Sequence, residues 1–280
     1  MRIIRTAKSI ARASRAIVAQ GETLALVPTM GYLHAGHLAL VKRAKKHATR
    51  IIVSIFVNPA QFSPSEDLSN YPRNTRRDLQ LLRELDVDLV YMPNANDVYP
   101  AGFSTYVEVK GLTDTLEGKS RPDHFRGVTT IVAKLFNVCR PDVVVFGQKD
   151  FQQAAVLQKM TSDLDYPLKF IVAPTIREKD GLALSSRNVY FNERERREAV
   201  CLYRGLVAAR RAYRAGEKSG AKLRKIVRTE AKKVCPTVDF DYAALTDSKT
   251  LKPLSKAISG ATLSTAAKVH GVRLIDNFKL

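Results

Sequence analysis

Two histidines and two glycines lie where an apolar run gives way to a helical pattern. The stretch PTMGYLHAGH, residues 28–37, follows the run TLALV and precedes LALVKRAKKHA. His34 and His37 are three residues apart, so on one helical turn both imidazoles face the same side. Gly31 and Gly36 permit a sharp turn or a close approach of the backbone to a ligand. The pattern is compatible with a metal site, a phosphate site or a structural turn alone.

A phosphate group explains this pattern better than the other two readings. The first N–H groups of a helix have no partner within the helix, and the helix dipole is positive at that end, so the position attracts anions. A His-x-x-His pair without an evident third ligand is weak support for zinc. The stretch matches neither the Gly-x-Gly-x-x-Gly of dinucleotide folds nor the P-loop. We therefore predict that His34 and His37 face a phosphate-containing ligand.

Two further stretches carry groups that suit phosphate. In FGQKDFQQ, residues 146–153, Lys149 offers a positive charge, and Asp150 and Gln153 add hydrogen-bonding groups. In LALSSRN, residues 182–188, two hydroxyls and a guanidinium follow one another and suit phosphate oxygens. Taken alone, the first stretch is equally compatible with a charge and a helix cap, and the second is more typical of an N-cap.

Amide side chains and a long irregular segment complete the candidates. Asn58 and Gln61 follow a buried run in FVNPAQF, residues 56–62, where buried amides can recognise hydroxyl or carboxylate groups of a small substrate. The segment EGKSRPDHFRGV, residues 117–128, is interrupted by Gly and Pro and is predicted to be a lid or flap. We expect its histidine, His124, to pack or to lie on the surface rather than to catalyse.

Continuous apolar runs alternate with helical patterns through the first part of the chain. The runs suit strands buried on both faces of a sheet, and they cover residues 23–28, 50–57, 87–92, 141–147 and 168–173. The helix candidates between them are residues 37–48, 73–86, 127–139 and 149–163. This rhythm predicts an α/β fold with a doubly wound, mostly parallel sheet, in which ligands bind beyond the carboxyl ends of the strands.

The pattern changes near residue 176. Two charged helical stretches, residues 193–214 and 220–233, precede three short runs that indicate a small, mostly antiparallel sheet. We therefore predict two domains: a Rossmann-like domain over residues 1–176 and a smaller α+β domain over residues 177–280.

The formal net charge is +19, and residues 193–233 alone carry 14 Lys or Arg against 5 Asp or Glu. Clustered positive charge binds nucleic acid backbones by releasing counterions. No recognisable nucleic-acid module accompanies this charge, so solvated helix faces explain it better. We accordingly expect no nucleic-acid partner.

Cysteine usage and hydropathy bear on location. The three cysteines are odd in number and widely spaced, which fits reduced thiols in the cytoplasm rather than disulfides. No run approaches the ~20 apolar residues of a membrane span, so no membrane association is expected. The first 21 residues read as an amphipathic helix and lack the long apolar segment of a secretory signal.

Six short motifs, in order across nearly the whole chain, resemble those of the pantothenate synthetase (pantoate–β-alanine ligase) family. They are VPTMGYLHAGH, SIFVNPAQF, SRPDHFRGV, FGQKDFQQ, LSSRN and RLIDNF. Each is weak alone, but six in order are highly specific, although the H-x-G-H element also occurs in some aminoacyl-tRNA synthetases. The resemblance implies a nucleotidyltransferase-like Rossmann variant. Its reaction condenses pantoate with β-alanine through a pantoyl adenylate, and ATP is converted to AMP and pyrophosphate.

The resemblance also assigns roles to individual residues. It places His34, His37 and Lys149 at the reacting phosphates as catalytic residues. It places pantoate at Gln61 and Gln153, with Asn58 as a further substrate-binding residue and Gln61 also near β-alanine. The ATP contacts that it implies are Met30, Gly31, Tyr32, Leu33, His34, Ala35, Gly36, His37, Gly147, Gln148, Lys149, Asp150, Ile176, Leu184, Ser185, Ser186 and Arg187.

The resemblance further implies Mg²⁺ with the ATP, with Asp78 near it, and a cytoplasmic homodimer. Two residues depart from the family pattern: Leu184 stands where Met is usual, and Asp123 where Gly is common. The first exchanges side chains of similar volume, and the second bears on the mobility of the flap.

Two other functions stay open on the sequence alone. Another adenylate-forming enzyme, such as a reduced tRNA synthetase, would account for both H-x-G-H and the positive charge. Against it, Gln61 and Gln153 suit a hydroxy acid, and no tRNA-binding module is evident. An RNA-binding protein that uses residues 193–233 would show an affinity that falls steeply with salt.

Overall fold

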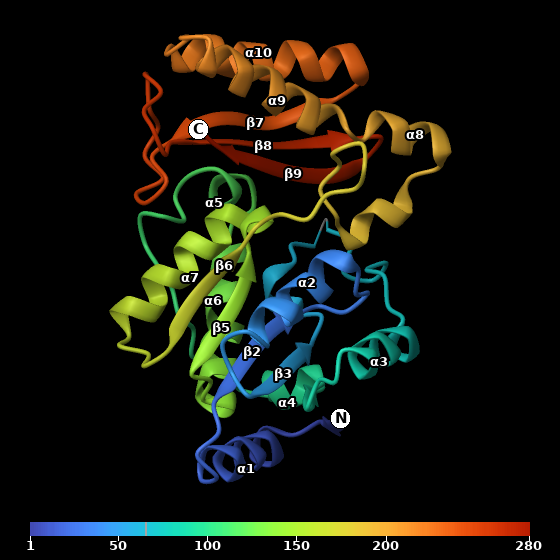
Figure 1. Cartoon of the computed structure of the whole chain (residues 1–280), viewed down its shortest axis with the longest axis vertical. Coiled ribbons are helices and arrows are strands. Elements are labelled where there is room, and N and C mark those ends of the chain that lie inside the picture. The colour runs from blue at the N-terminus through green and yellow to red at the C-terminus, as the bar shows by residue number, and fades with distance from the viewer. Residues whose placement is uncertain (65) are drawn as a thin grey trace.

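The structure, a computed structural model, describes residues 1–64 and 66–280. Its larger sheet has six parallel strands in the order β1-β4-β3-β2-β5-β6, of which Figure 1 labels β2, β3, β5 and β6. The strands are β1 (Arg2–Ile4), β2 (Leu24–Thr29), β3 (Arg50–Ile55), β4 (Leu89–Tyr91), β5 (Val143–Gly147) and β6 (Lys169–Ala173). Strands β2 and β3 pair in register from Leu24–Arg50 to Thr29–Ile55, so the segments that follow them leave the sheet side by side.

Helices pack on both faces of this sheet, which makes it doubly wound as predicted. On one face the core includes apolar residues of α1 (Ala7–Val18), α6 (His124–Cys139) and α7 (Phe151–Asp163). On the other face the core includes residues of α2 (Ala35–Ala44) and α3 (Thr75–Glu84). Because the central strands are buried on both sides, their sequences are continuous apolar runs rather than alternating ones.

The C-terminal part is a separate layer of sheet and helices. Its antiparallel sheet has the order β7-β8-β9, and α9 and α10 cover one face of it (Figure 1). The elements are α8 (Glu193–Glu198), α9 (Cys201–Arg214), α10 (Gly220–Val234), β7 (Asp239–Thr246), β8 (Thr262–Val269) and β9 (Val272–Lys279). Figure 1 shows this layer above the carboxyl ends of the parallel strands, so it covers the edge where ligands bind in such folds.

Short helices occupy irregular segments between the longer elements of the chain. They are the 3₁₀ helices η1 (Pro59–Gln61), η2 (Gln148–Asp150) and η3 (Ser186–Tyr190), and the α-helices α4 (Ala95–Val98) and α5 (Glu117–Ser120). Helix α5 and the start of α6 make up the segment that the sequence predicts as a flap. No helix in the described part of the chain is long and apolar enough to cross a membrane.

The structure confirms the five predicted strands and four predicted helices of the first part, with ends that differ by a few residues. Two expectations were wrong. The chain begins with a three-residue edge strand, β1, before its first helix, because Ile3 and Ile4 pair with Val90 and Tyr91 of β4. The predicted helix 193–214 is broken into α8, which has no buried residue, and α9, whose buried residues pack on the sheet.

Arg273 and Asn277 of the closing RLIDNF motif tie the two layers together, and Asp276 of the same motif holds the segment that connects them. Arg273 of β9 donates to both carboxylate oxygens of Glu117 in α5, over 2.6 and 2.8 Å. Asp276 accepts from the Arg177 guanidinium over 2.6 and 2.7 Å. The Asn277 amide donates to the backbone oxygens of Gln148 and Lys149 over 3.0 and 2.9 Å. The C-terminal sheet is therefore attached directly to the end of β5.

Candidate active site

The segment between β2 and α2 is a tight turn held by backbone and hydroxyl contacts. Gly31 has φ +83° and Tyr32 has φ 49°, so two successive residues take the left-handed conformation. Thr29 Oγ1 donates to the backbone oxygen of Ser54 over 2.8 Å and accepts from the Gly31 N–H over 3.2 Å. The turn thereby reverses the chain direction at the strand end and delivers the two histidines to the start of α2.

Asp78 of α3 holds this turn in place through hydrogen bonds. Its side chain is buried, and its two carboxylate oxygens accept the backbone N–H groups of Tyr32 over 2.8 Å and of Leu33 over 2.7 Å. Burial raises the pKa of this carboxyl, while the two N–H groups act in the opposite direction. The family resemblance places Asp78 near a magnesium ion, whereas the structure engages both of its oxygens in holding the turn.

The two imidazoles are oriented by their own backbone. The Gly36 N–H donates to His34 Nδ1 over 3.1 Å, and the His34 N–H donates to His37 Nδ1 over 3.3 Å. A backbone N–H can only donate, so both Nδ1 atoms are acceptors and each neutral ring carries its proton on Nε2. A Cβ at Gly36 would lie 2.8 Å from His34 Cε1, so a larger residue there would displace the imidazole from this position. Both histidines thus keep an Nε2–H donor for a ligand.

The histidines are neutral at physiological pH. Burial, followed by the positive charge of Lys149, lowers the pKa of His34 to about 4. Burial, with His34 and Lys149 nearby, holds the pKa of His37 well below its ordinary value. In this state the pair can donate hydrogen bonds to an oxyanion, but it carries no charge to contribute and no excess proton to give to a leaving group.

A cavity of about 230 Å³ opens at this strand edge. The predicted site residues in its wall come from five separate segments, and they are Met30, His34, Gly36, His37, Asn58, Gln61, Gly147, Lys149, Asp150, Gln153, Ile176, Leu184, Ser185, Ser186 and Arg187. Within the described part of the chain, the remaining predicted residues lie outside this wall. They are Gly31, Tyr32, Leu33 and Ala35, in or next to the turn, and Gln148, whose amide donates to Asn277 Oδ1 over 3.2 Å.

The two predicted amides of the 56–62 segment play different parts. Asn58 is buried, and its amide donates to Gln61 Oε1 and to the backbone oxygen of Gly127, each over 3.1 Å. Its own Oδ1 accepts from the Tyr99 hydroxyl over 2.7 Å. Through these contacts Asn58 is held in place and orients the side chain of Gln61. The Gln61 amide nitrogen contacts the weak acceptor Met30 Sδ, at 3.4 Å, so it is the member of the pair available to a substrate.

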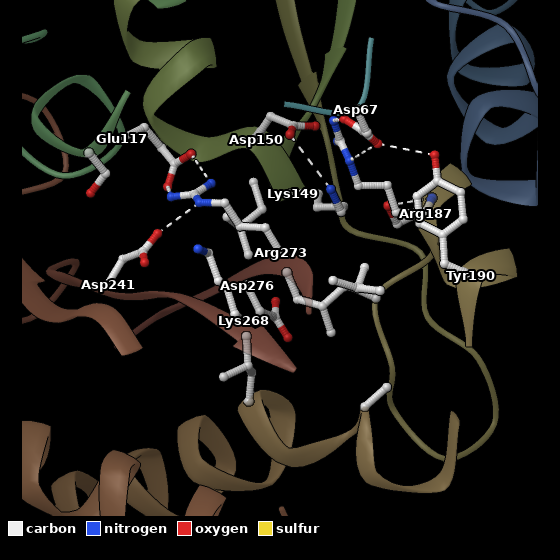
Figure 2. Close-up of a pocket in the computed structure, with 18 of the residues that line it drawn as sticks. Asp67, Glu117, Lys149, Asp150, Arg187, Tyr190, Asp241, Lys268, Arg273 and Asp276 are labelled. Atoms are coloured by element: carbon white, nitrogen blue, oxygen red, sulfur yellow. Dashed lines mark hydrogen bonds and ion pairs between the residues drawn. The ribbon is translucent and has the colours of Figure 1, made fainter. Parts of the chain in front are cut away.

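The cationic side chains at the cavity are paired with carboxylates. Arg187 donates to Asp67 over 3.0 and 2.8 Å, and the Tyr190 hydroxyl donates to the same carboxylate over 3.1 Å (Figure 2). Lys149 Nζ lies 3.6 Å from the carboxylate of Asp150. Lys149 and Arg187 also line a larger adjoining cavity of about 680 Å³ between the two layers. The cations predicted to meet phosphate therefore already hold anionic partners.

Sequence reasoning missed the role of the flap residues. Arg121 lines the cavity and donates to Glu66 over 2.5 and 2.8 Å. His124 is buried in the cavity wall, where its Nδ1 lies 2.8 Å from the Gln61 backbone oxygen. Burial, followed by the charge of Arg121, lowers the pKa of His124 to about 4. The motif SRPDHFRGV contains both residues, but nothing in its spacing shows that they contact the segment of Gln61.

Further polar groups of the wall were not singled out from the sequence. Among the described residues, the buried hydroxyls of Ser54 and Thr175 have no hydrogen-bond partner, and both residues line the cavity. Such groups are available to a bound ligand. Asp123 has φ 64°, which explains physically why Gly suits this position: the left-handed conformation costs a residue with a side chain more than it costs Gly.

Comparisons with known proteins agree with this architecture. The family model described as Pantoate-beta-alanine ligase matches residues 2–279. A pantothenate synthetase of Geobacter sulfurreducens is 49% identical over 277 residues, covering 99% of this chain and 98% of that protein. One of Moorella thermoacetica is 46% identical over 280 residues, covering 100% of this chain and 99% of the relative.

Solved structures give the same result. A crystal structure of the pantothenate synthetase of Thermus thermophilus superposes with a TM-score of 0.94 at 44% identity, covering 100% of this chain and 99% of that one. The pantoate-beta-alanine ligase of Francisella tularensis, complexed with beta-gamma ATP and beta-alanine, gives 0.81 at 32% identity, covering 100% and 97%. The whole-chain match to the family model and these full-length relatives together show that the chain belongs to the pantoate–β-alanine ligase family.

Proposed function

We propose that this chain condenses pantoate with β-alanine to pantothenate, through a pantoyl adenylate, and releases AMP and pyrophosphate. Family membership over residues 2–279 supports this reaction. The observation in the chain itself that carries the proposal is the pair of neutral imidazoles, both with Nδ1 engaged by backbone N–H groups, in a cavity that also presents Lys149 and Arg187. This arrangement supplies donors and positive charge where a triphosphate gathers negative charge.

In the first step, an oxygen of the pantoate carboxylate attacks the α-phosphorus of ATP. A P–O bond to the carboxylate forms, and the bond from the α-phosphorus to the bridging oxygen breaks, so that pyrophosphate leaves with the electron pair. The Nε2–H groups of His34 and His37 donate to phosphate oxygens, and Lys149 neutralises charge on the reacting groups. Because both imidazoles are neutral, we assign them hydrogen-bond donation rather than proton transfer to pyrophosphate.

In the second step, the amine of β-alanine attacks the acyl carbon of the adenylate. The C–N bond of pantothenate forms, the attacking nitrogen loses a proton to solvent, and AMP leaves with the electrons of the C–O bond. Gln61 and Gln153 hold the pantoate, and Asn58 fixes the amide of Gln61 in the orientation that the substrate meets. Catalysis is by alignment and charge stabilisation, without a covalent enzyme intermediate. Burial raises the pKa of Cys139 and of Cys201 to about 12, which fits thiols that take no part in the reaction.

The nucleotide extends from this centre along the cavity wall. We place the adenine at Ile176, beside the unpartnered hydroxyl of Thr175, and the ribose at residues 147–150. Ser185, Ser186 and Arg187 close on the triphosphate from the other side. In this assignment residues 1–176 form the domain that binds ATP and pantoate, and residues 177–280 form its cover.

Mg²⁺ bound with the ATP would supply positive charge at the phosphate oxygens. Asp150 contributes a carboxylate to the wall of the 230 Å³ cavity, and hard oxygen donors of this type suit Mg²⁺. Asp78 is less suited, since both of its oxygens already accept hydrogen bonds. A homodimer is proposed on the family resemblance, and a cytoplasmic location on that resemblance and on three free, buried cysteines. No nucleic-acid partner is proposed for the basic helices.

Exchange of labelled pyrophosphate into ATP tests the reaction. We expect exchange to require pantoate but not β-alanine, and the complete reaction to yield AMP. Deleting the pantoate hydroxyl, or changing Gln61 or Gln153 to Ala, should lower exchange at least ~10²-fold, because buried polar groups are left unpaired. Formation of ADP would contradict the adenylate. Exchange driven by a proteinogenic amino acid would instead indicate the tRNA-synthetase alternative.

A further inference from the structure

Three potential metal ligands from three separate elements converge in the C-terminal part. Glu198 is the last residue of α8, Cys235 directly follows α10, and His270 lies in the turn between β8 and β9. His270 Nε2 is 2.9 Å from Glu198 Oε2 and 4.0 Å from Cys235 Sγ. The three donor atoms all lie within 4.8 Å of one another. None of these residues lines the 230 Å³ cavity or enters the proposed reaction.

We propose that Glu198, Cys235 and His270 form a binding site for a divalent cation of the zinc type, with water in the fourth position. Thiolate, imidazole and carboxylate together are a ligand set typical of Zn²⁺ rather than of Mg²⁺ or Ca²⁺, which prefer oxygen alone. A tetrahedral ion at about 2.0–2.3 Å from its donors requires donor atoms about 3.2–3.8 Å apart. The distance from His270 Nε2 to Glu198 Oε2, 2.9 Å, lies just below that range, and the distance from His270 Nε2 to Cys235 Sγ, 4.0 Å, lies just above it. Small side-chain rotations would therefore complete the site.

The local backbone presents the imidazole to the thiol. His270 and Gly271 have φ 48° and 81°, the pair of left-handed residues found in a two-residue hairpin turn. Asn and Gly are the most frequent residues there, and histidine also adopts the left-handed conformation more readily than most residues. The ring of His270 crosses from this turn to Glu198, while Cys235 is fully buried beneath them. The side chains of His270 and Glu198 are 23% and 22% exposed, which leaves an entry path for an ion.

The charges at the site also suit a divalent cation. When the thiol releases its proton on binding, the Cys235 thiolate and the Glu198 carboxylate bring two negative charges, which balance the ion. Thr237 Oγ1 lies 3.5 Å from Cys235 Sγ and can donate a hydrogen bond to the thiolate. The ion would join the end of α8, the end of α10 and the β8–β9 hairpin. Gly271 and Ala199, next to two of the ligands, line the 680 Å³ cavity, so the site stiffens the cover at that wall.

Cobalt titration of the full-length, chelator-treated chain tests this proposal. We expect one equivalent of Co²⁺ to produce intense tetrahedral d–d bands and a near-ultraviolet thiolate charge-transfer band, both removed by added Zn²⁺. The Cys235→Ala variant should lose the charge-transfer band. His270→Asn, which keeps a residue suited to the left-handed turn, should lower the affinity at least ~10-fold. Zn²⁺ should raise the melting temperature of the unaltered chain by about 5 °C and that of Cys235→Ala not at all.

Cys201→Ala is the matched control, because Cys201 is a buried thiol of the same core cluster that the proposal leaves out of the ligand set. This variant should keep the charge-transfer band and its stoichiometry. Pyrophosphate exchange should be unchanged in all three variants, which separates this site from the proposed reaction. A chain without the charge-transfer band would overturn the proposal. So would a band that survives in both Cys235→Ala and His270→Asn, or one lost in Cys201→Ala.

Discussion

The histidine turn and the cationic contacts of the cover are built differently, although Arg187 of the cover lines the same cavity as the two histidines. At the turn, backbone N–H groups donate to the side chains of His34, His37 and Asp78, and the imidazoles are uncharged. At the cover, Arg187 and Arg273 reach across to carboxylates of the other layer. The turn is therefore organised before any ligand binds, whereas the cover is held by contacts that another anion can replace.

This difference has an energetic meaning. Donors fixed by their own backbone need no rearrangement when charge develops on a phosphate, and such preorganised donors are the more effective in stabilising a transition state. Exchanging the carboxylate of Asp67 for a phosphate keeps Arg187 paired, so the exchange costs little. In the proposed function, the turn therefore performs the chemistry and the ion pairs govern closure over the nucleotide.

The largest effect is expected at the histidines. His34→Ala and His37→Ala should each lower turnover by ~10²–10³, the range for losing one well-placed donor or acid. Melting temperatures should change little, because the side chains border a cavity rather than fill the core. His47→Ala, which removes an imidazole outside the cavity, is the control for turnover and thermal melting. Near-normal turnover per folded molecule together with a large loss of stability would mean that the two imidazoles serve the turn alone.

Asp78→Asn tests whether the carboxylate of Asp78 holds the turn. The amide presents an N–H₂ group to one of the two backbone N–H groups that the carboxylate now satisfies. We expect unfolding in urea to show a loss of about 1–3 kcal/mol, the cost of a buried donor left without an acceptor. Pyrophosphate exchange should fall as well, because His34 and His37 lose their fixed position. If Asp78→Asn changed neither the free energy of unfolding nor pyrophosphate exchange, the turn would not be more rigidly held than the ion pairs of the cover.

Acid should weaken the cavity wall before it breaks the ion pairs of the cover. The folded pKa values of His34 and His124 are about 4, against an ordinary 6.5, so between these values the unfolded chain binds more protons than the folded one. Stability is therefore full above pH 6.5 and falls as the pH drops toward 4, by about 1–3 kcal/mol per histidine. Urea unfolding at a series of pH values measures this loss.

The cover is expected to respond later. Burial alone would raise the pKa values of Asp67 and Glu117, but Arg187 and Arg273 hold them below their ordinary range, so these ion pairs are lost only at lower pH. Replacing His34, His37 and His124 with Gln should flatten the profile between pH 6.5 and 4, because burial also holds the pKa of His37 below its ordinary value. A profile that keeps its slope in this triple variant would contradict the assignment of that window to the histidines.

The smallest effect is expected at Asp67. Asp67→Asn removes the carboxylate that holds Arg187 and so frees the guanidinium for phosphate. We expect calorimetry to show ATP binding about 3–10-fold more tightly. The gain is small because a partly exposed ion pair contributes little energy. In an Arg187→Ala background the same change should have no effect, which is the double-mutant test of coupling. Weaker ATP binding in Asp67→Asn would show that Asp67 positions the guanidinium for phosphate rather than competing with it.

Much of the fold could be predicted from the sequence because it depends on the local pattern of apolar and polar residues. Continuous apolar runs at 23–28 and 50–57 indicated strands buried on both faces, and the structure confirms both within a few residues. The three-residue strand β1 could not be predicted, because so short a segment shows no hydrophobic periodicity and forms a strand only by pairing with β4. The break between α8 and α9 was hidden because both parts are helical and charged.

The sequence by itself determined which residues stand at the strand ends, and with them most of the wall of the candidate site. Only the tertiary structure decided their states and partners. The neutrality of His34 and His37 comes from burial, the use of Asp78 as a brace comes from a contact 46 residues away, and Arg187 meets Asp67 across 120 residues. Desolvation and long-range pairing depend on which segments the fold brings together, and no local spacing encodes that.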